Sequence, residues 1–123
     1  MAHILAVDDE PEIVKLVARL LEARGHRVSI ARDGQAALDA VAAERPDVMV
    51  IDSALPKLDG LTVTLRLKSS PETKDLPIVL MTVVPPTVEE ADRELGIGPD
   101  EYVVKPFLHE VLVQNVERLV TTR

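Results

Sequence analysis

The chain has 123 residues, of which 46% are hydrophobic and 28% are charged, and its formal net charge is −7. This length fits one domain, residues 1–123, and the composition is that of an ordinary globular protein. The acidic balance and the lack of any run of five basic residues argue against direct binding of nucleic acid.

Two further features of the sequence narrow the class of protein. Cysteine is absent, which excludes disulfides, thiolate metal sites and cysteine nucleophiles. No apolar run approaches the roughly 18 residues of a membrane-spanning helix, and the start of the chain lacks the pattern of a signal peptide. We therefore expect a cytoplasmic protein without a membrane partner.

Short apolar runs and stretches of helical periodicity alternate along the chain. We expect strands at residues 3–7, 27–31, 48–52, 77–82 and 101–104. We expect helices from Pro11 to before Gly25, from the Asp33-Gly34 turn to before Pro46, at about 60–68, at 87–95, and from near Leu108 onward. This alternation predicts a doubly wound α/β domain with a parallel sheet and helices on both faces.

Two of the strand runs differ in how they are patterned. Val48 to Ile51 are all apolar, which is typical of a strand that is buried on both faces. In residues 27–31 apolar and polar side chains alternate, which favours a strand near an edge of the sheet.

The sequence also suggests which side chains are buried and which are solvated. In the third helix we expect Leu61, Leu65 and Val63 to face inward. For the last helix the expected core residues are Val111, Leu112, Val116, Leu119 and Val120. Phe107 is expected in the core, whereas His3, His26 and His109 are expected to be solvated residues without a metal or phosphotransfer role.

Polar residues end four of the five strand runs. Asp8-Asp9, Asp52, Thr82 and Lys105 follow the first, third, fourth and fifth runs. Because parallel strands point their carboxyl ends to one rim, these side chains can meet there. Three carboxylates placed together need a cation, and hard oxygen ligands without Cys or His favour Mg²⁺. Such a site is suited to binding a phosphoryl group that Asp52 attacks.

Each of these residues also has a structural interpretation. Asp52 could cap a turn, and Asp8, Asp9 and Glu10 could be acids that favour the positive end of the following helix. Tyr102, taken alone, is better explained by a place in the core than by a switch role.

As a set, however, these motifs resemble the response-regulator receiver domains of two-component signalling, over essentially the whole chain. The matching residues are Asp8-Asp9, Asp52, Pro56 with Asp59-Gly60, Thr82, and the segment 102–107, Tyr-Val-Val-Lys-Pro-Phe. The resemblance implies a flavodoxin-like (βα)₅ fold with strand order 2-1-3-4-5.

The resemblance also implies a function for the acidic residues. Asp52 would accept a phosphoryl group from a sensor histidine kinase, a phosphotransfer protein or a small acyl phosphate. Mg²⁺ would be held by Asp8, Asp9, Asp52 and the backbone carbonyl of Ala54, with Asp9 the usual direct ligand.

Three further residues would carry the switch. Lys105 would pair with the phosphoryl group, the Thr82 hydroxyl would move toward it, and Tyr102 would then turn inward. The surface formed by the fourth helix, fifth strand and fifth helix would change, and a homodimer through that face is a further expectation.

The sequence departs from the family pattern at three places. Val83 replaces a small residue and narrows access to Asp52, while Pro85-Pro86 stiffens the loop that normally rearranges. Ala54 and Val84 offer no polar side chain that could position a hydrolytic water. We therefore expect slow loss of the phosphoryl group.

Two other functions fit parts of this pattern. A receiver-like scaffold that acts without phosphorylation is compatible with Val83 and Pro85-Pro86. A small Mg²⁺-dependent phosphatase of the haloacid dehalogenase type would also use a strand-end aspartate. Its nucleophile, however, ends the first strand in an Asp-x-Asp pattern, whereas here the first run ends in Asp8-Asp9-Glu10.

Overall fold

The computed structural model of the chain describes residues 2–83 and 98–121. The elements follow one another as β1 (His3–Val7), α1 (Pro11–Glu22), β2 (Arg27–Ala31), α2 (Gly34–Ala43), β3 (Val48–Asp52), α3 (Gly60–Ser69), β4 (Ile78–Thr82), β5 (Glu101–Val104) and α5 (His109–Thr121). The helix expected at residues 87–95, together with Val84 and Pro85-Pro86, lies outside the described residues.

The five strands form one parallel sheet in the order β2-β1-β3-β4-β5. This confirms the predicted α/β fold class and the predicted place of β2 at an edge. From β1 the chain adds β2 on one side of the sheet and then β3, β4 and β5 on the other, so the strand order reverses between β1 and β3. A parallel α/β sheet opens a crevice at such a point. The carboxyl ends of β1 and β3 therefore frame the region where a site is expected.

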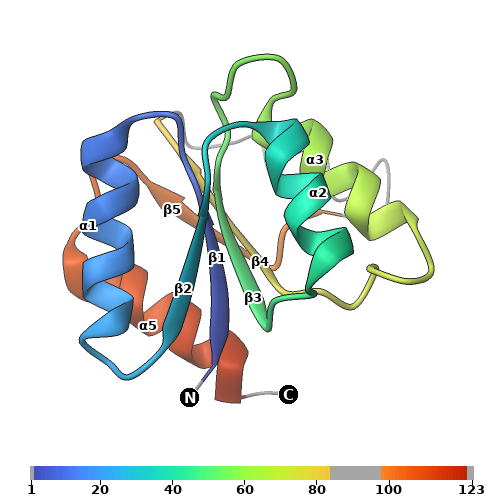
Figure 1. The fold of residues 1–123 in the computed structure, drawn as a ribbon. Helices are drawn as coiled ribbons and strands as arrows, with labels where there is room; N and C mark the ends of the chain where they lie inside the picture. Colours follow the sequence, from blue (N-terminus) through green and yellow to red (C-terminus); the bar gives the residue numbers. More distant parts are fainter. Residues whose placement is uncertain (1, 84–97, 122–123) are drawn as a thin grey trace.

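Helices cover both faces of the sheet, with α1 and α5 on one side and α2 and α3 on the other (Figure 1). Alternate residues of the central strands enter the two cores. In β3, Val48 and Val50 pack toward the α1–α5 side, and Met49 and Ile51 pack toward the α2–α3 side. Because both faces of β3 are covered, its residues are all apolar up to Ile51, which gives the continuous apolar run seen in the sequence.

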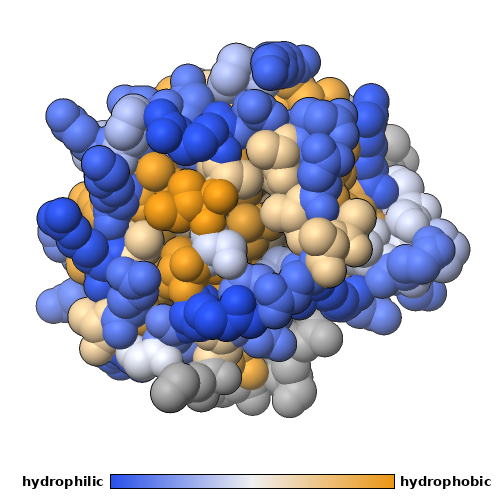
Figure 2. Space-filling model, in the orientation of Figure 1, coloured by the Kyte–Doolittle hydropathy of each residue, from blue (hydrophilic) through white to orange (hydrophobic). Residues whose placement is uncertain are grey.

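The edge strand β2 is less completely covered. Figure 2 shows apolar surface between α1 and α2 along this strand, and Ile30 is 47% exposed. This partial cover explains the alternating pattern of residues 27–31. None of the helices in residues 2–83 and 98–121 has the length and apolarity that a membrane-spanning helix needs.

The prediction for the inward face of α3 was wrong in part. Val63, Thr64 and Leu67 are buried, whereas Leu65 is only half-buried and lies beside Arg66 at the surface. Asp59 sets the start of the helix, because its carboxylate accepts the N–H of Thr62 at 2.8 Å. The Thr64 hydroxyl is satisfied inside the helix by donating to the Gly60 carbonyl at 2.8 Å, which lets a polar residue occupy the core.

The helix α5 also differs from the prediction at one position. The predicted residues Leu112 and Val116 are buried, and Leu119 and Val120 pack against the core half-buried. Val111 is 39% exposed, however, and the neighbouring Val113 is buried in its place. Phe107 precedes the helix and is half-buried, because it packs against the edge of the core on the α1–α5 side instead of lying inside it.

The histidine prediction was wrong for two of the three residues. His26 is 8% exposed: the Ala2 N–H donates to its Nδ1 at 3.2 Å, and its Nε2 lies 3.1 Å from Glu117 Oε2. The ring of His3 is 10% exposed, with Nε2 2.8 Å from the Ser29 hydroxyl. His109 is exposed, as expected.

Candidate functional site

Acidic side chains converge at the carboxyl end of the sheet. Asp8 follows β1 and is fully buried, Asp52 ends β3 and is 4% exposed, and Asp9 is exposed at the mouth. One carboxylate oxygen from each of the three lies within 4.8 Å of the others. The structure thus brings together three residues that are up to 44 positions apart in the sequence.

Within residues 2–83 and 98–121, one ammonium group faces these acids. Lys105 follows β5, and its Nζ lies 2.9 Å from Asp8 Oδ2 and 3.2 Å from Asp52 Oδ1. The Glu10 carboxylate lies farther away, at 3.8 Å, and is largely exposed. The Lys105 N–H donates to the Thr82 carbonyl at 2.7 Å, which fixes the lysine backbone against β4. Its side chain therefore reaches over the ends of β4 and β3 toward β1.

The charges at this rim are coupled. Burial raises the pKa of Asp52, and the neighbouring Asp8 carboxylate raises it further, against the opposing effects of Lys105 and of the Ala54 N–H. Burial opposes the charge of Lys105, but the bonds to Asp8 and Asp52 outweigh it and raise the pKa of the lysine. Three carboxylates share one close ammonium, so the site can accommodate a further cation.

The donor set fits a magnesium ion. Three carboxylate oxygens within a few ångströms, one of them on the exposed Asp9, are hard ligands at a place that water can reach. Ala54 contacts the site through its N–H, which donates to the Asp52 carboxylate. The predicted use of the Ala54 carbonyl as a ligand stays a prediction.

Two glycines hold the segment after Asp52 in place. The Gly60 N–H donates to the Ser53 carbonyl at 2.9 Å, and a Cβ on Gly60 would overlap the backbone carbonyl of Asp52. A Cβ on Gly34 would overlap the carbonyl of Leu58. The predicted Asp59-Gly60 turn is present, but its tight contact with the phosphoacceptor candidate was not visible in the sequence.

The two other predicted switch residues lie on neighbouring strands. Thr82 ends β4, is 8% exposed, and is paired with Val104 in the sheet register. Tyr102 lies in β5 and is half-buried against the core on the α2–α3 side. The Lys105–Pro106 peptide bond is cis.

Sequence reasoning missed two features of this rim. Arg32 follows β2, and its Nη2 donates to the Asp9 carbonyl at 3.4 Å. An apolar pocket of about 260 Å³ opens next to Lys105, between the start of α1 and the loop before α5. It is lined by Glu10, Ile13, Leu16, Val83, Lys105, Pro106 and Phe107. Arg32 directly follows the second predicted strand, and this position could have revealed it, because the residues after the other four strands were all assigned to the site.

Residues 4–117 match the family described as the response regulator receiver domain. The chain belongs to this family. Its members act in two-component signalling, so the predicted resemblance is confirmed. The chain is 40% identical over 118 residues to the response regulator MprA of Mycobacterium leprae and 39% identical to that of Mycolicibacterium vanbaalenii. In both cases the match covers 96% of this chain and 50% of the relative, so the chain spans about half the length of these relatives.

Solved receiver structures have the same fold. The receiver domain of a signal transduction histidine kinase from Syntrophus aciditrophicus superposes with a TM-score of 0.88 at 29% identity, over 99% of this chain and 92% of that one. The chemotaxis response regulator CheY4 of Vibrio cholerae gives a TM-score of 0.86 at 30% identity, over 97% and 98% of the two chains. This receiver domain is thus similar both to a part of a larger signalling protein and to a regulator of its own length.

Proposed function

We propose that residues 1–123 form one receiver domain that works as a phosphorylation-activated switch, with Asp52 as the phosphoacceptor. The observation that supports it best is the joint contact of Lys105 with Asp8 and Asp52, at 2.9 and 3.2 Å, beside the exposed Asp9. An acceptor carboxylate, a cationic partner and a set of metal ligands meet there at one rim.

The transfer step follows from the groups at this rim. An oxygen of Asp52 attacks the phosphorus in line, the bond from phosphorus to the donor breaks, and its electron pair leaves with the donor. Lys105 neutralises charge on the phosphoryl oxygens, and the Thr82 hydroxyl is placed at the end of β4 to donate to them. Mg²⁺ held by Asp8, Asp9 and Asp52 supplies positive charge when bound.

The surface next to the site supports a protein as the donor. The apolar pocket beside Lys105 includes Val83, which is 66% exposed, and Phe107, and the neighbouring Leu108 is 74% exposed. Exposed apolar side chains that surround a reactive group favour docking of another protein. We assign this role to a sensor histidine kinase or phosphotransfer protein, which places the domain in the cytoplasm with its ATP-using kinase.

The readout of phosphorylation lies on the side of β5 and α5. Only residues 105–108 separate β5 from α5, so a shift of the Lys105 ammonium toward a phosphoryl group acts directly on the start of the helix. Tyr102 would turn inward in response, and a homodimer would form through the face of the fourth helix, β5 and α5. In this role phosphorylation changes which proteins the domain binds, and the domain does not act as an enzyme on an external substrate.

Intact-mass measurement after incubation with acetyl phosphate and MgCl₂ tests the proposal. We expect one phosphoryl group on the wild-type chain and none on Asp52→Asn, which keeps the size of the side chain but removes the nucleophile. No adduct on the wild type would favour the scaffold. Sustained release of phosphate from a simple phosphate ester would favour the phosphatase.

A further inference from the structure

We propose that Arg32 is an electrostatic positioning residue that draws an anionic phosphoryl donor, such as a small acyl phosphate, to the Asp9 side of the site. This inference rests on the proposed function and deepens it. It assigns a role to the one strand end that the predicted constellation left unused.

The backbone of the sheet places Arg32 at the rim. β2 pairs with β1 so that Ala31 lies opposite Val7, and the Asp8 N–H donates to the Ala31 carbonyl at 3.2 Å. Arg32, the residue that follows β2, therefore lies alongside Asp8 and Asp9 whatever rotamer its side chain adopts. The bond from its Nη2 to the Asp9 carbonyl, at 3.4 Å, directs the guanidinium toward the mouth of the acidic cluster.

The charge of Arg32 is not committed to an ion pair. Among residues 2–83 and 98–121, no carboxylate oxygen lies within 4.0 Å of its guanidinium. The adjacent Asp33 faces another way, since it accepts the Ala36 N–H at 2.8 Å and lies 3.8 Å from Lys57. In contrast, Arg24, Arg27 and Arg118 are each paired with a glutamate at 2.6 to 2.8 Å.

A donor that approaches this rim meets mainly negative charge. The acids Asp8, Asp9 and Glu10 lie around the Asp52 acceptor, and the ammonium of Lys105 is already bonded to the two buried carboxylates. A phosphoryl donor with two negative charges is therefore repelled unless cations offset these acids. Arg32 supplies one such cation at the entrance, in addition to Mg²⁺ on the carboxylates, and by the same electrostatics it weakens the binding of Mg²⁺.

The rate of phosphorylation by acetyl phosphate at low ionic strength tests this role. We expect the second-order rate constant to fall about threefold in Arg32→Gln and about tenfold in Arg32→Glu, with the difference fading at high salt. Phosphoramidate carries one charge fewer at neutral pH and should be affected less. Arg66→Glu, on the exposed last turn of α3, makes the same change in net charge away from the rim and should leave both rates unchanged.

Binding of Mg²⁺, measured by calorimetry, separates electrostatics from structural damage. In Arg32→Glu the affinity for Mg²⁺ should rise while phosphorylation slows. A fall in both would show that the variant distorts the site, and equal rates in all variants would show that Arg32 has no role; either result overturns the inference. If the wild type accepts no phosphoryl group from either donor, the proposed function fails instead.

Discussion

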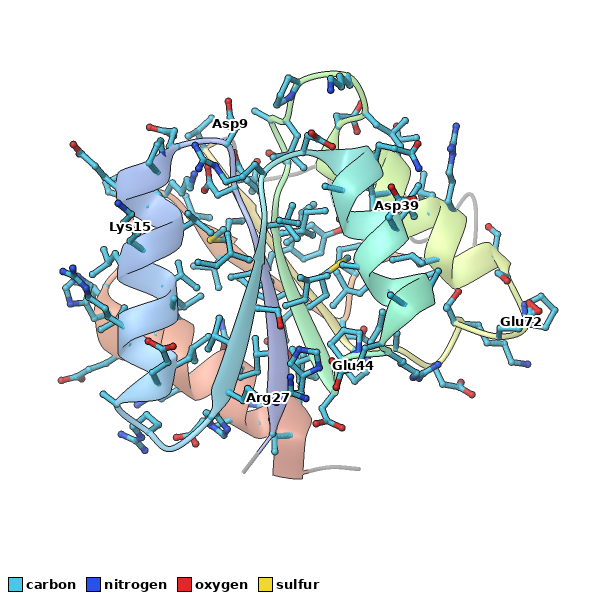
Figure 3. The ribbon with its side chains drawn as sticks, in the orientation of Figure 1. Asp9, Lys15, Arg27, Asp39, Glu44 and Glu72 are labelled. Carbon is cyan, nitrogen blue, oxygen red and sulfur yellow. The ribbon has the colours of Figure 1, made fainter. Side chains whose placement is uncertain are left out.

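The two ends of the sheet use their charged residues in opposite ways. At the amino end of the strands, acids lie in close ion pairs with bases. Figure 3 shows Arg27 and Glu44 close together there, far from Asp9 at the other end. Ion pairs of this end include Arg27–Glu44, Lys68–Asp100, Arg24–Glu117 and Arg118–Glu101, at 2.6, 2.7, 2.6 and 2.8 Å.

At the carboxyl end the balance is broken. Asp8, Asp9 and Asp52 share the close ammonium of Lys105, and two of the three carboxylates are buried. Matched pairs join elements of the fold and need no further partner. An excess of buried charge of one sign costs stability, and it is retained where a ligand or a reaction supplies the missing charge. The difference between the two ends thus points to the functional rim.

The largest difference is expected in the binding of Mg²⁺. Asp8→Asn removes a buried carboxylate from the acidic cluster, so we expect the affinity for Mg²⁺, measured by calorimetry, to fall about 100-fold. Asp47→Asn is the matched change at the amino end, where the carboxylate only accepts the His3 N–H. It should leave the affinity unchanged, and an equal loss in both variants would contradict the assignment of the rim.

The second prediction concerns how long the phosphoryl group stays on Asp52. Ala54 is exposed next to the site and offers only its methyl group, so no side chain there orients an attacking water. We expect hydrolysis over minutes or longer, and about tenfold faster hydrolysis in Ala54→Glu, followed by loss of the phosphoryl mass. A wild-type lifetime of seconds would contradict this expectation.

The third prediction breaks a matched pair at the amino end. Glu117 accepts from the buried His26 and pairs with Arg24, so Glu117→Ala leaves a buried ring nitrogen without its partner. Chemical denaturation should show a loss of about 1–2 kcal/mol in the free energy of unfolding. Glu117→Gln retains an acceptor for His26 and should lose less. Phosphorylation by acetyl phosphate should be unchanged in both variants.

The smallest expected effect is a gain in stability at the carboxyl end. Because the pKa of Asp52 is raised in the folded state, its contribution to stability is complete below about pH 3.9, the ordinary value for aspartate. That contribution is lost as the pH rises through the folded pKa. Asp52→Asn should therefore be about 1 kcal/mol more stable than the wild type at pH 7 without Mg²⁺, with the difference vanishing toward pH 4. A less stable variant at pH 7 would contradict the excess of negative charge.

The strands and the convergence of acids could be predicted from the sequence because both depend on local patterns. Continuous apolar runs marked the central strands, and the polar residue that ended each run marked the rim. The faces of α3 and α5 were harder to predict. Apolar residues there are too numerous to define one stripe, and a residue such as Thr64 enters the core by bonding within its own helix.

The environment of the histidines could not be predicted for a different reason. His26 is buried by contacts with Ala2 and Glu117, which lie 24 and 91 positions away in the chain. The periodicity of apolar residues along a helix or strand gives no information about contacts between residues so far apart in the chain. Arg32 was overlooked although its place after a strand was readable, because a basic residue did not fit the acidic pattern that drew attention to the other strand ends.

The orientation of the Asp52 carboxylate depends on Gly60, a residue that has no side chain and takes no part in the reaction. Any side chain at position 60 would push against the peptide that leaves Asp52, although the two residues are eight positions apart. Evolution can therefore vary the apolar neighbours of the rim more readily than this glycine. A survey of natural variants that looks only at acids and lysine would miss a position where the backbone leaves no room for a side chain.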